Sequence, residues 1–195
     1  MDRSEFDILK SKRLVLRHFR DSDLESFLAH RNDPEVSRYQ IWDSIDRQEA
    51  SDFIQEQMSR QPGVAGQGFQ FAVEMNSTGE LIGDCYLKIK DEDWRQAEIG
   101  VTLAPEHQGA GFAAEAVSSV LDYVFTELNL HRVVAVTDCE NDASVALLER
   151  LGMRREGHFI ENIWFKGRWG DEFQYAILKD EWLALCGLDS QANAE

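Results

Sequence analysis

The most informative segment of the chain is Pro105-Glu106-His107-Gln108-Gly109-Ala110-Gly111-Phe112-Ala113-Ala114-Glu115-Ala116. It lies between a predicted strand and a long predicted helix, whose apolar stripe begins at Ala113. Free backbone N–H groups at a helix start lie at the positive end of the helix dipole, so they can bind a pyrophosphate without a lysine. Small residues let phosphates approach closely. The alternative is a glycine-containing turn without a ligand, because a lone Gly-x-Gly is a weak signal.

Outward from this stretch, strand-like and helix-like segments alternate. The turn-forming residues 76–79 separate two strand-like runs, which predicts an antiparallel hairpin. Strands are predicted at Leu14–Leu16, Phe69–Met75, Leu81–Ile89, Ala97–Leu103 and His131–Asp138, and on both sides of the turn at 166–170. Helices are predicted at Asp21–Asn32, from Asp46, from Gly111, from Asn141 to Leu151 and around Trp182. The pattern predicts an α/β (α+β) fold with a mixed sheet of about seven strands and helices on both faces.

No repeat or long linker divides the chain, so residues 1–195 are predicted to form a single domain. Its core is expected at about 13–182, followed by a flexible tail at 188–195. No apolar run approaches the ~20 residues that span a bilayer, and the N-terminal residues are charged, so no membrane partner is expected.

The composition narrows the class of protein. The chain has 43% apolar and 29% charged residues, as soluble globular proteins do. Its three cysteines show no paired spacing, which favours a reducing, cytoplasmic location. Neither they nor the five histidines have metal-ligand spacing, so no metal is expected. The net charge of −16 repels phosphate backbones, which argues against nucleic acid and favours cationic partners.

The quoted stretch also carries a family resemblance. Gln108-x-x-Gly111-x-Ala113 resembles the Gln/Arg-x-x-Gly-x-Gly/Ala signature of the GNAT N-acetyltransferases. The likeness runs from about Arg13 to Trp182. Within the family, the chain resembles the branch of ribosomal-protein N-terminal alanine acetyltransferases. Further matching segments are Ala97-Glu98-Ile99-Gly100, Asn141-Asp142-Ala143-Ser144, Leu151-Gly152-Met153 and the turn at 164–171.

The resemblance implies a single domain with a largely antiparallel twisted sheet and acetyl-coenzyme A as co-substrate. The strand before the loop is expected to splay from its neighbour and to pair with the pantetheine arm. The residues implied to bind the coenzyme are Val101, Thr102, Leu103, Gln108, Gly109, Ala110, Gly111, Phe112, Ala113, Ala114, Asn141, Ser144 and Arg150. For two of them a structural alternative stays open: Asn141 can merely cap its helix, and Arg150 can be a solvated side chain.

Acetyl transfer to an amine needs a base, because an alkyl amine with a pKa near ~10 is protonated at neutral pH. Glu98 is the first candidate, and the alternative is an exposed strand glutamate that pairs with Lys88 or Arg95. Glu161 is the second candidate, and Asp138 at a strand end is the third.

Other catalytic roles have candidates too. The tyrosine that many family members use as proton donor is replaced by Leu148, and Ser144 is the best substitute, although it can serve only the backbone. The backbone N–H of Val101 is expected to stabilise the oxyanion. Cys139 invites a covalent ping-pong route, but strand-end cysteines usually pack as small apolar residues.

The acceptor is expected to be a protein N-terminus, such as that of a ribosomal protein, or a small cationic amine. Trp42, Trp164 and Trp169 are candidate walls of its pocket, with core or turn packing as the alternative. The competing function is a non-catalytic acyl-coenzyme A-binding module that senses metabolite level or binds a partner protein, which would keep the loop and lose the base. Monomer and homodimer both stay open.

Overall fold

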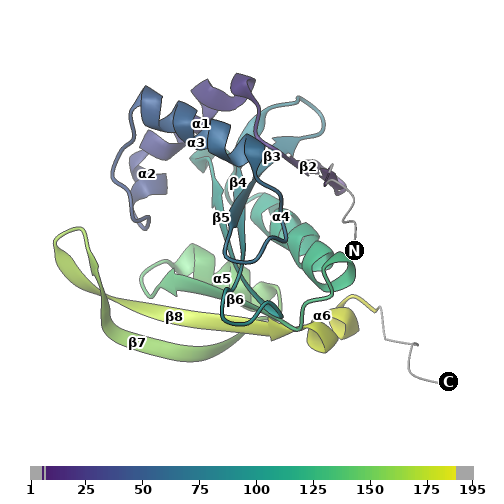
Figure 1. Cartoon of the computed structure of the whole chain (residues 1–195). Helices are drawn as coiled ribbons and strands as arrows, with labels where there is room; N and C mark the ends of the chain where they lie inside the picture. Colours follow the sequence, from purple (N-terminus) through teal and green to yellow (C-terminus); the bar gives the residue numbers. More distant parts are fainter. Residues whose placement is uncertain (1–5, 7, 188–195) are drawn as a thin grey trace.

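The computed structural model describes residue 6 and residues 8–187 of the chain. The predicted tail at 188–195 lies outside these residues. One eight-stranded sheet runs in the order β1-β2-β3-β4-β5-β6-β8-β7 (Figure 1). Its strands are β1 Ile8–Lys10, β2 Leu14–Arg17, β3 Gly68–Met75, β4 Leu81–Ile89, β5 Gln96–Leu103, β6 Arg132–Asp138, β7 Arg154–Phe165 and β8 Arg168–Leu178. Every neighbouring pair is antiparallel except β5 and β6. The predicted fold class is confirmed, and β1 is the one strand that the sequence did not indicate.

Helices cover both faces of the sheet, as predicted. The α-helices are α1 Leu24–Asn32, α2 Pro34–Ser37, α3 Arg47–Ser59, α4 Phe112–Asp122, α5 Asp142–Arg150 and α6 Lys179–Leu185. Short 3-10 turns precede α1 and α4, and a π turn at Tyr123–Glu127 extends α4. No helix in the described part of the chain is long and apolar enough to cross a bilayer.

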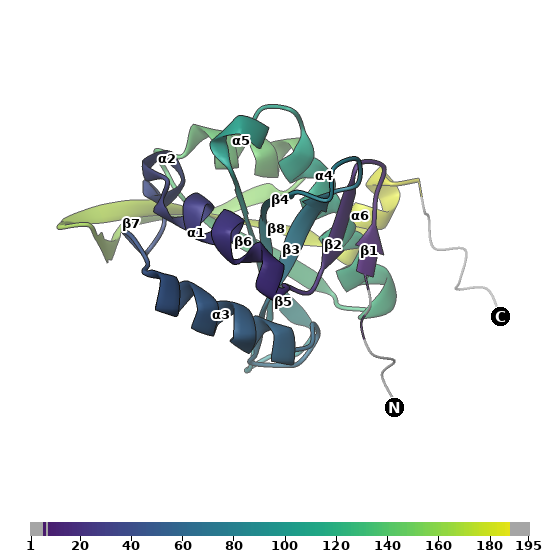
Figure 2. The ribbon, with the colours of Figure 1, turned by 90° about the horizontal axis from the view of Figure 1, so that it is seen from above.

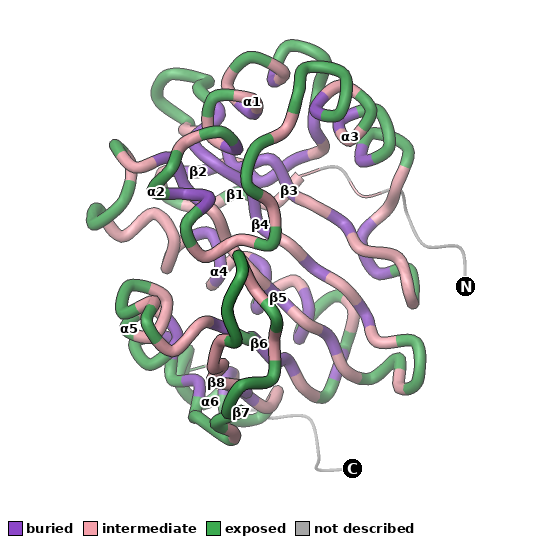
Figure 3. The backbone as a smooth tube through the Cα atoms, turned by 90° about the vertical axis from the view of Figure 1, so that its left-hand side faces the viewer, coloured by how far each residue is buried: buried purple, intermediate pink, exposed green. Residues whose placement is uncertain are grey.

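The larger core lies between the sheet and α4, α5 and α6. Along β4 and β5, alternate residues such as Cys85, Leu87 and Ile99 enter this core. A smaller core under α1 and α3 contains Phe27, Ile54 and other apolar residues on the opposite face. The buried residues follow the central strands (Figure 3).

Strands β7 and β8 form a long hairpin at the edge of the sheet. Its tip lies far from α6, which follows β8 directly (Figures 1 and 2). Lys166 and Gly167 form the turn, and both have positive φ angles, of 47° and 81°. The Lys166 Nζ donates to the backbone oxygen of Ser37 at 2.8 Å, so the tip is attached to the segment after α2.

Candidate active site

The parallel strands β5 and β6 pair only over their first three residues. Gln96, Ala97 and Glu98 pair with residues 132–134, and no pairing follows as β5 continues to Leu103. On its other edge β5 stays paired with β4 along its whole length. The backbone groups of residues 99–103 that face β6 therefore have no strand partner, and they can hydrogen-bond an extended ligand in the gap.

The glycine loop closes the end of this gap. Gly109 and Gly111 have φ angles of +72° and +82°, in the left-handed region that favours glycine. Gly111 is the residue before α4 and supplies no side-chain cap, so the first N–H groups of the helix are left for a ligand. The Gln108 Nε2 donates to the backbone oxygen of Leu103 at 3.0 Å and folds the loop against the end of β5.

A groove of about 410 Å³, here called the coenzyme groove, runs along the loop, β5 and α5. Of the residues predicted to bind the coenzyme, it is lined by Val101, Thr102, Leu103, Gln108, Gly109, Gly111, Ala113, Ala114, Asn141, Ser144 and Arg150. Ala110 and Phe112 do not line it. The Ala110 carbonyl instead accepts a hydrogen bond from Arg13, whose guanidinium lies 4.2 Å from the centre of the Phe112 ring.

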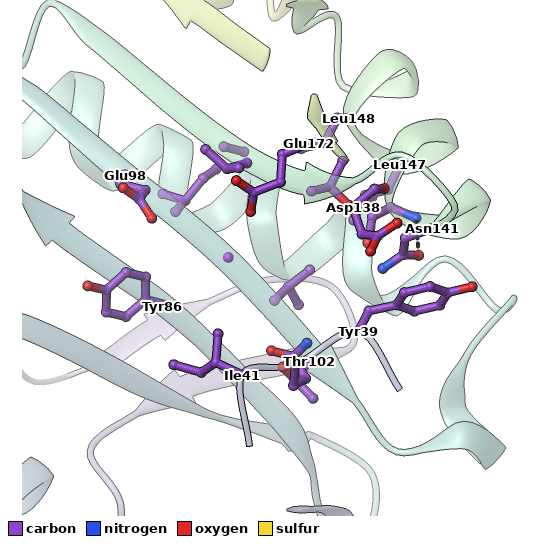
Figure 4. A pocket seen from close by; sticks show the side chains of 18 of the residues that line it. Tyr39, Ile41, Tyr86, Glu98, Thr102, Asp138, Asn141, Leu147, Leu148 and Glu172 are labelled. Atoms are coloured by element: carbon purple, nitrogen blue, oxygen red, sulfur yellow. Dashed lines mark hydrogen bonds between the residues drawn. The ribbon is translucent and has the colours of Figure 1, made fainter. Parts of the chain in front are cut away.

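A second cavity, of about 520 Å³, adjoins this groove and is here called the acceptor cavity (Figure 4). Four carboxylates line it, against the single guanidinium of Arg31, and these acids are Asp84, Glu98, Asp138 and Glu172. The two cavities share seven lining residues: Tyr39, Gln40, Val101, Thr102, Asn141, Ser144 and Leu147. The Tyr39 hydroxyl donates to the backbone oxygen of Glu140 at 3.0 Å, which joins the segment after α2 to the loop after β6.

Glu98 lies on the wall of the acceptor cavity, on the same side as Tyr86 (Figure 4). Burial, and after it the charge of Glu98, raises the pKa of Tyr86. Glu98 is in register with Lys88, yet within residues 8–187 neither Lys88 nor Arg95 forms an ion pair with it. Arg95 pairs instead with Asp93, at 2.7 Å. The alternative interpretation, in which Glu98 is an exposed strand residue paired with Lys88 or Arg95, is therefore not supported by an ion pair.

The other predicted catalytic residues lie at different places. Glu161 is exposed on β7, donates its backbone N–H to Asp171 at 2.8 Å, and lines neither cavity. Asn141 does cap α5, because its Oδ1 accepts from the backbone N–H of Ser144 at 3.1 Å. Asn141 and Ser144 also line both cavities. Asp138 lines the acceptor cavity while its carboxylate accepts the Glu140 N–H at 2.7 Å.

The three tryptophans that were candidate walls of the acceptor pocket lie at two different places. Trp42 lines the acceptor cavity, and the Arg31 guanidinium lies 4.0 Å from its ring centre. Trp164 and Trp169 contact each other at 5.5 Å between ring centres, are 61% and 53% exposed, and line neither cavity. Cys139 also lines neither cavity.

The sequence reasoning missed a buried ion pair in the acceptor cavity. Arg31 Nη2 lies 3.2 Å from Asp84 Oδ2, and both residues are only 5% exposed. Burial raises the pKa of Asp84, and the charges of Arg31 and His30 oppose that rise. The signal was present, since Asp84 interrupts the apolar strand Leu81–Ile89, but its partner on α1 could not be read from spacing. Tyr39, Tyr86 and Glu172 were missed as lining residues as well.

Across the described residues, no group of three or more histidine, cysteine or acidic side chains is placed to hold a metal ion. The splayed strand pair, the glycine loop that opens α4, and a second cavity that adjoins the groove are together typical of the class of coenzyme A-dependent acyltransferases.

The chain belongs to the GNAT acetyltransferase family, because the family profile "Acetyltransferase (GNAT) domain" matches residues 13–154. It is similar to the N-acetyltransferase p20 of Bacillus licheniformis, with 36% identity over 90% of this chain and 98% of that one. It is an acetyl-CoA-dependent acetyltransferase. The family resemblance predicted from the loop is thereby confirmed.

Two further relatives bear on the acceptor. The spermidine N-acetyltransferase of Vibrio cholerae, solved in complex with CoA and spermine, superposes with a TM-score of 0.76 at 30% identity, covering 89% of this chain and 99% of that one. YdaF of Bacillus subtilis, provisionally named a ribosomal N-acetyltransferase, is 36% identical over 53% of this chain and 57% of its own. Relatives of the ribosomal branch are therefore among those found.

Proposed function

We propose that the enzyme acetylates a small cationic amine, which enters the acceptor cavity and reacts where that cavity meets the coenzyme groove. The observation that carries the proposal is this meeting point, formed by Thr102, Asn141, Ser144 and the other shared residues. In this scheme the groove holds acetyl-CoA, with its pyrophosphate on the loop at 109–114 and its pantetheine along residues 101–103.

The reaction runs by direct attack in a ternary complex. Glu98 takes a proton from the ammonium form of the acceptor, directly or through water, and frees the nitrogen lone pair. The nitrogen attacks the thioester carbonyl carbon, and the backbone N–H of Val101 stabilises the oxygen as it becomes negative. The tetrahedral centre then collapses and the C–S bond breaks. The second proton of the attacking nitrogen passes through Ser144 or water to the departing thiolate, so Ser144 keeps its own proton, and Glu98 returns the first proton to solvent. A thiol with an ordinary pKa near ~8.5 needs little help.

The charge of the cavity supports a polycationic acceptor. The Arg31 and Asp84 charges offset each other, which leaves three carboxylates facing the ligand. Glu98 lies on one side of the cavity and Asp138 on the other, so Asp138 can neutralise a second charge on an acceptor whose reacting nitrogen gives its proton to Glu98 (Figure 4). A peptide N-terminus is the second candidate, favoured by the YdaF relative.

Coenzyme A release with a panel of amines tests the proposal. We expect turnover with spermidine or a similar polyamine, with a second-order rate constant that falls between 0.1 M and 1 M salt as the Debye length shrinks from ~10 Å to ~3 Å. A neutral or anionic best acceptor contradicts the proposal. A peptide as the best acceptor selects the second candidate, and coenzyme binding without turnover of any amine selects the sensor alternative.

A further inference from the structure

We infer that Arg13 is a positioning residue, which holds the glycine loop and the first turn of α4 in the geometry that binds the coenzyme pyrophosphate. The inference rests on the proposed function, since it takes this loop as the pyrophosphate site. Arg13 lies just before β2, about 100 positions from the loop in sequence, and still makes four contacts with the loop and the first turn of α4.

Two of these contacts go to a carboxylate in the first turn of α4. The backbone N–H and the Nε of Arg13 both donate to Glu115, each at 2.6 Å, and the Ser11 Oγ donates to the same carboxylate at 2.7 Å. Burial opposes ionisation of Glu115, but the hydrogen bonds from Ser11 and Arg13 outweigh it and lower the pKa of this carboxyl. Glu115 is therefore ionised at neutral pH.

An ionised glutamate at this position presents an electrostatic problem. It lies one turn from N–H groups that are proposed to bind an anion, and an uncompensated negative charge there repels that anion. The Arg13 guanidinium is close enough to neutralise it. Two functions thus coincide in one side chain: it cancels the charge of Glu115 and ties the helix start to β2.

The remaining contacts go to the loop itself. The Arg13 Nη1 donates to the Ala110 carbonyl at 2.9 Å, and the guanidinium lies 4.2 Å from the Phe112 ring centre. The Nη2 lies 3.5 Å from the position that a Cβ would take on Gly111.

These contacts explain why two loop residues do not line the groove. Gly109, Gly111, Ala113 and Ala114 line the coenzyme groove, whereas Ala110, Phe112 and Arg13 do not. The loop therefore has a front for the ligand and a back that rests on Arg13. Because it is on the back, Arg13 acts through the loop and not as a phosphate ligand.

The test compares two acetyl donors, acetyl-CoA and S-acetylpantetheine, which lacks the pyrophosphate. We expect Arg13→Met to raise the KM for acetyl-CoA about tenfold with kcat nearly unchanged, and to leave kcat/KM for S-acetylpantetheine as in the wild type. Arg13→Lys should recover part of the loss, because lysine keeps the charge but not the fork of donors.

Arg154→Met is the matched control. The Arg154 side chain is 42% exposed, against 39% for Arg13, and it also forms ion pairs, with Glu156 and Glu181. It lines neither cavity, so its loss should leave both donors unaffected. The double variant Arg13→Met/Glu115→Gln should bind coenzyme A more tightly than Arg13→Met alone, because it also removes the negative charge.

Equal losses with both donors in Arg13→Met, or no loss beyond that of Arg154→Met, would overturn the inference. Calorimetric titration with coenzyme A gives an independent readout, since it needs no acceptor. If the wild type binds coenzyme A but acetylates no amine, the proposed function fails while the role of Arg13 is still decided by the binding constants of the variants.

Discussion

Asp84 on β4 lies directly opposite Thr102 on β5, in the antiparallel register of the two strands. Directly opposed residues on one face have Cβ atoms roughly 5 Å apart. Thr102 lines both the coenzyme groove and the acceptor cavity, so a buried carboxylate lies beside the place where they meet. Its counterion, Arg31, comes from α1, on the helical layer over this face.

The buried pair predicts a stability effect. Asp84→Asn keeps the shape but leaves the Arg31 charge buried without a counterion, which should cost about 3 kcal/mol of unfolding free energy. Arg31→Met/Asp84→Asn removes both charges and should recover at least half of that. Urea denaturation at pH 7 measures both. If Asp84→Asn is as stable as the wild type, Asp84 is already protonated in the folded protein.

Glu98 should control the chemical step. Glu98→Gln should lower kcat by roughly 100-fold or more, the size expected for a lost general base, while coenzyme affinity stays nearly the same. Glu161→Gln is the control, since Glu161 lines neither cavity. Steady-state kinetics that show the reverse, with Glu161→Gln crippled and Glu98→Gln active, would move the base to β7.

Two glycines with the same backbone conformation allow the effect of backbone strain to be distinguished from an effect on coenzyme binding. Gly109 and Gly79 have φ angles of +72° and +73°, and a Cβ on either would meet no atom within 4 Å. Alanine at either site should therefore cost a similar ~1 kcal/mol of stability.

Only Gly109 lines the coenzyme groove, however. Gly109→Ala should thus raise the KM for acetyl-CoA by roughly tenfold, equivalent to about 1.4 kcal/mol, and Gly79→Ala should not change it. Equal kinetics for the two variants would show that the pyrophosphate binds elsewhere.

Cys139 should be dispensable. Burial, followed by the charges of Asp171 and Asp138, raises the pKa of its thiol, so little thiolate is present at neutral pH. We expect Cys139→Ala to retain the wild-type kcat. Mass spectrometry of the enzyme during turnover provides the decisive check, because an acetyl group on Cys139 would establish the ping-pong route.

Acid should weaken the fold through Glu156. Hydrogen bonds from Arg132, opposed by burial and assisted by Arg154, lower the pKa of Glu156 from 4.5 to about 2. A lowered carboxyl pKa stabilises the folded state above the unfolded pKa, and this stabilisation is lost as the pH falls from about 4.5 to about 2.

Because the side chain is partly exposed, we expect a contribution of only about 1 kcal/mol. Glu156→Gln should flatten the pH dependence of stability by that amount in this range, as measured by denaturant unfolding at pH 6 and pH 3. Parallel curves for wild type and variant would assign the acid sensitivity to other carboxylates.

Local features of the chain explain what could be predicted. The strand alternation at Ala97–Leu103 and the glycines at 109 and 111 act over a few residues, so their periods and turn preferences identify strand, loop and helix directly. The same locality explains the placement of Glu98 on the face opposite to Ile99. It also accounts for the missed strand β1, which is only three residues long and carries little periodic signal.

The fold class and the glycine loop before α4 could be predicted from the chain, because both depend on backbone conformation encoded over short stretches. The family could be predicted because the residues of its motif lie close together in the chain. The tertiary structure alone decided which side chains meet. Arg31 pairs with Asp84, which is 53 positions away in sequence, and Arg13 pairs with Glu115, which is 102 positions away. Glu161, a candidate from its position on a predicted strand, lies outside both cavities. Such encounters depend on how helices pack on the sheet and where strands separate, and the packing of distant segments leaves no local pattern in the sequence.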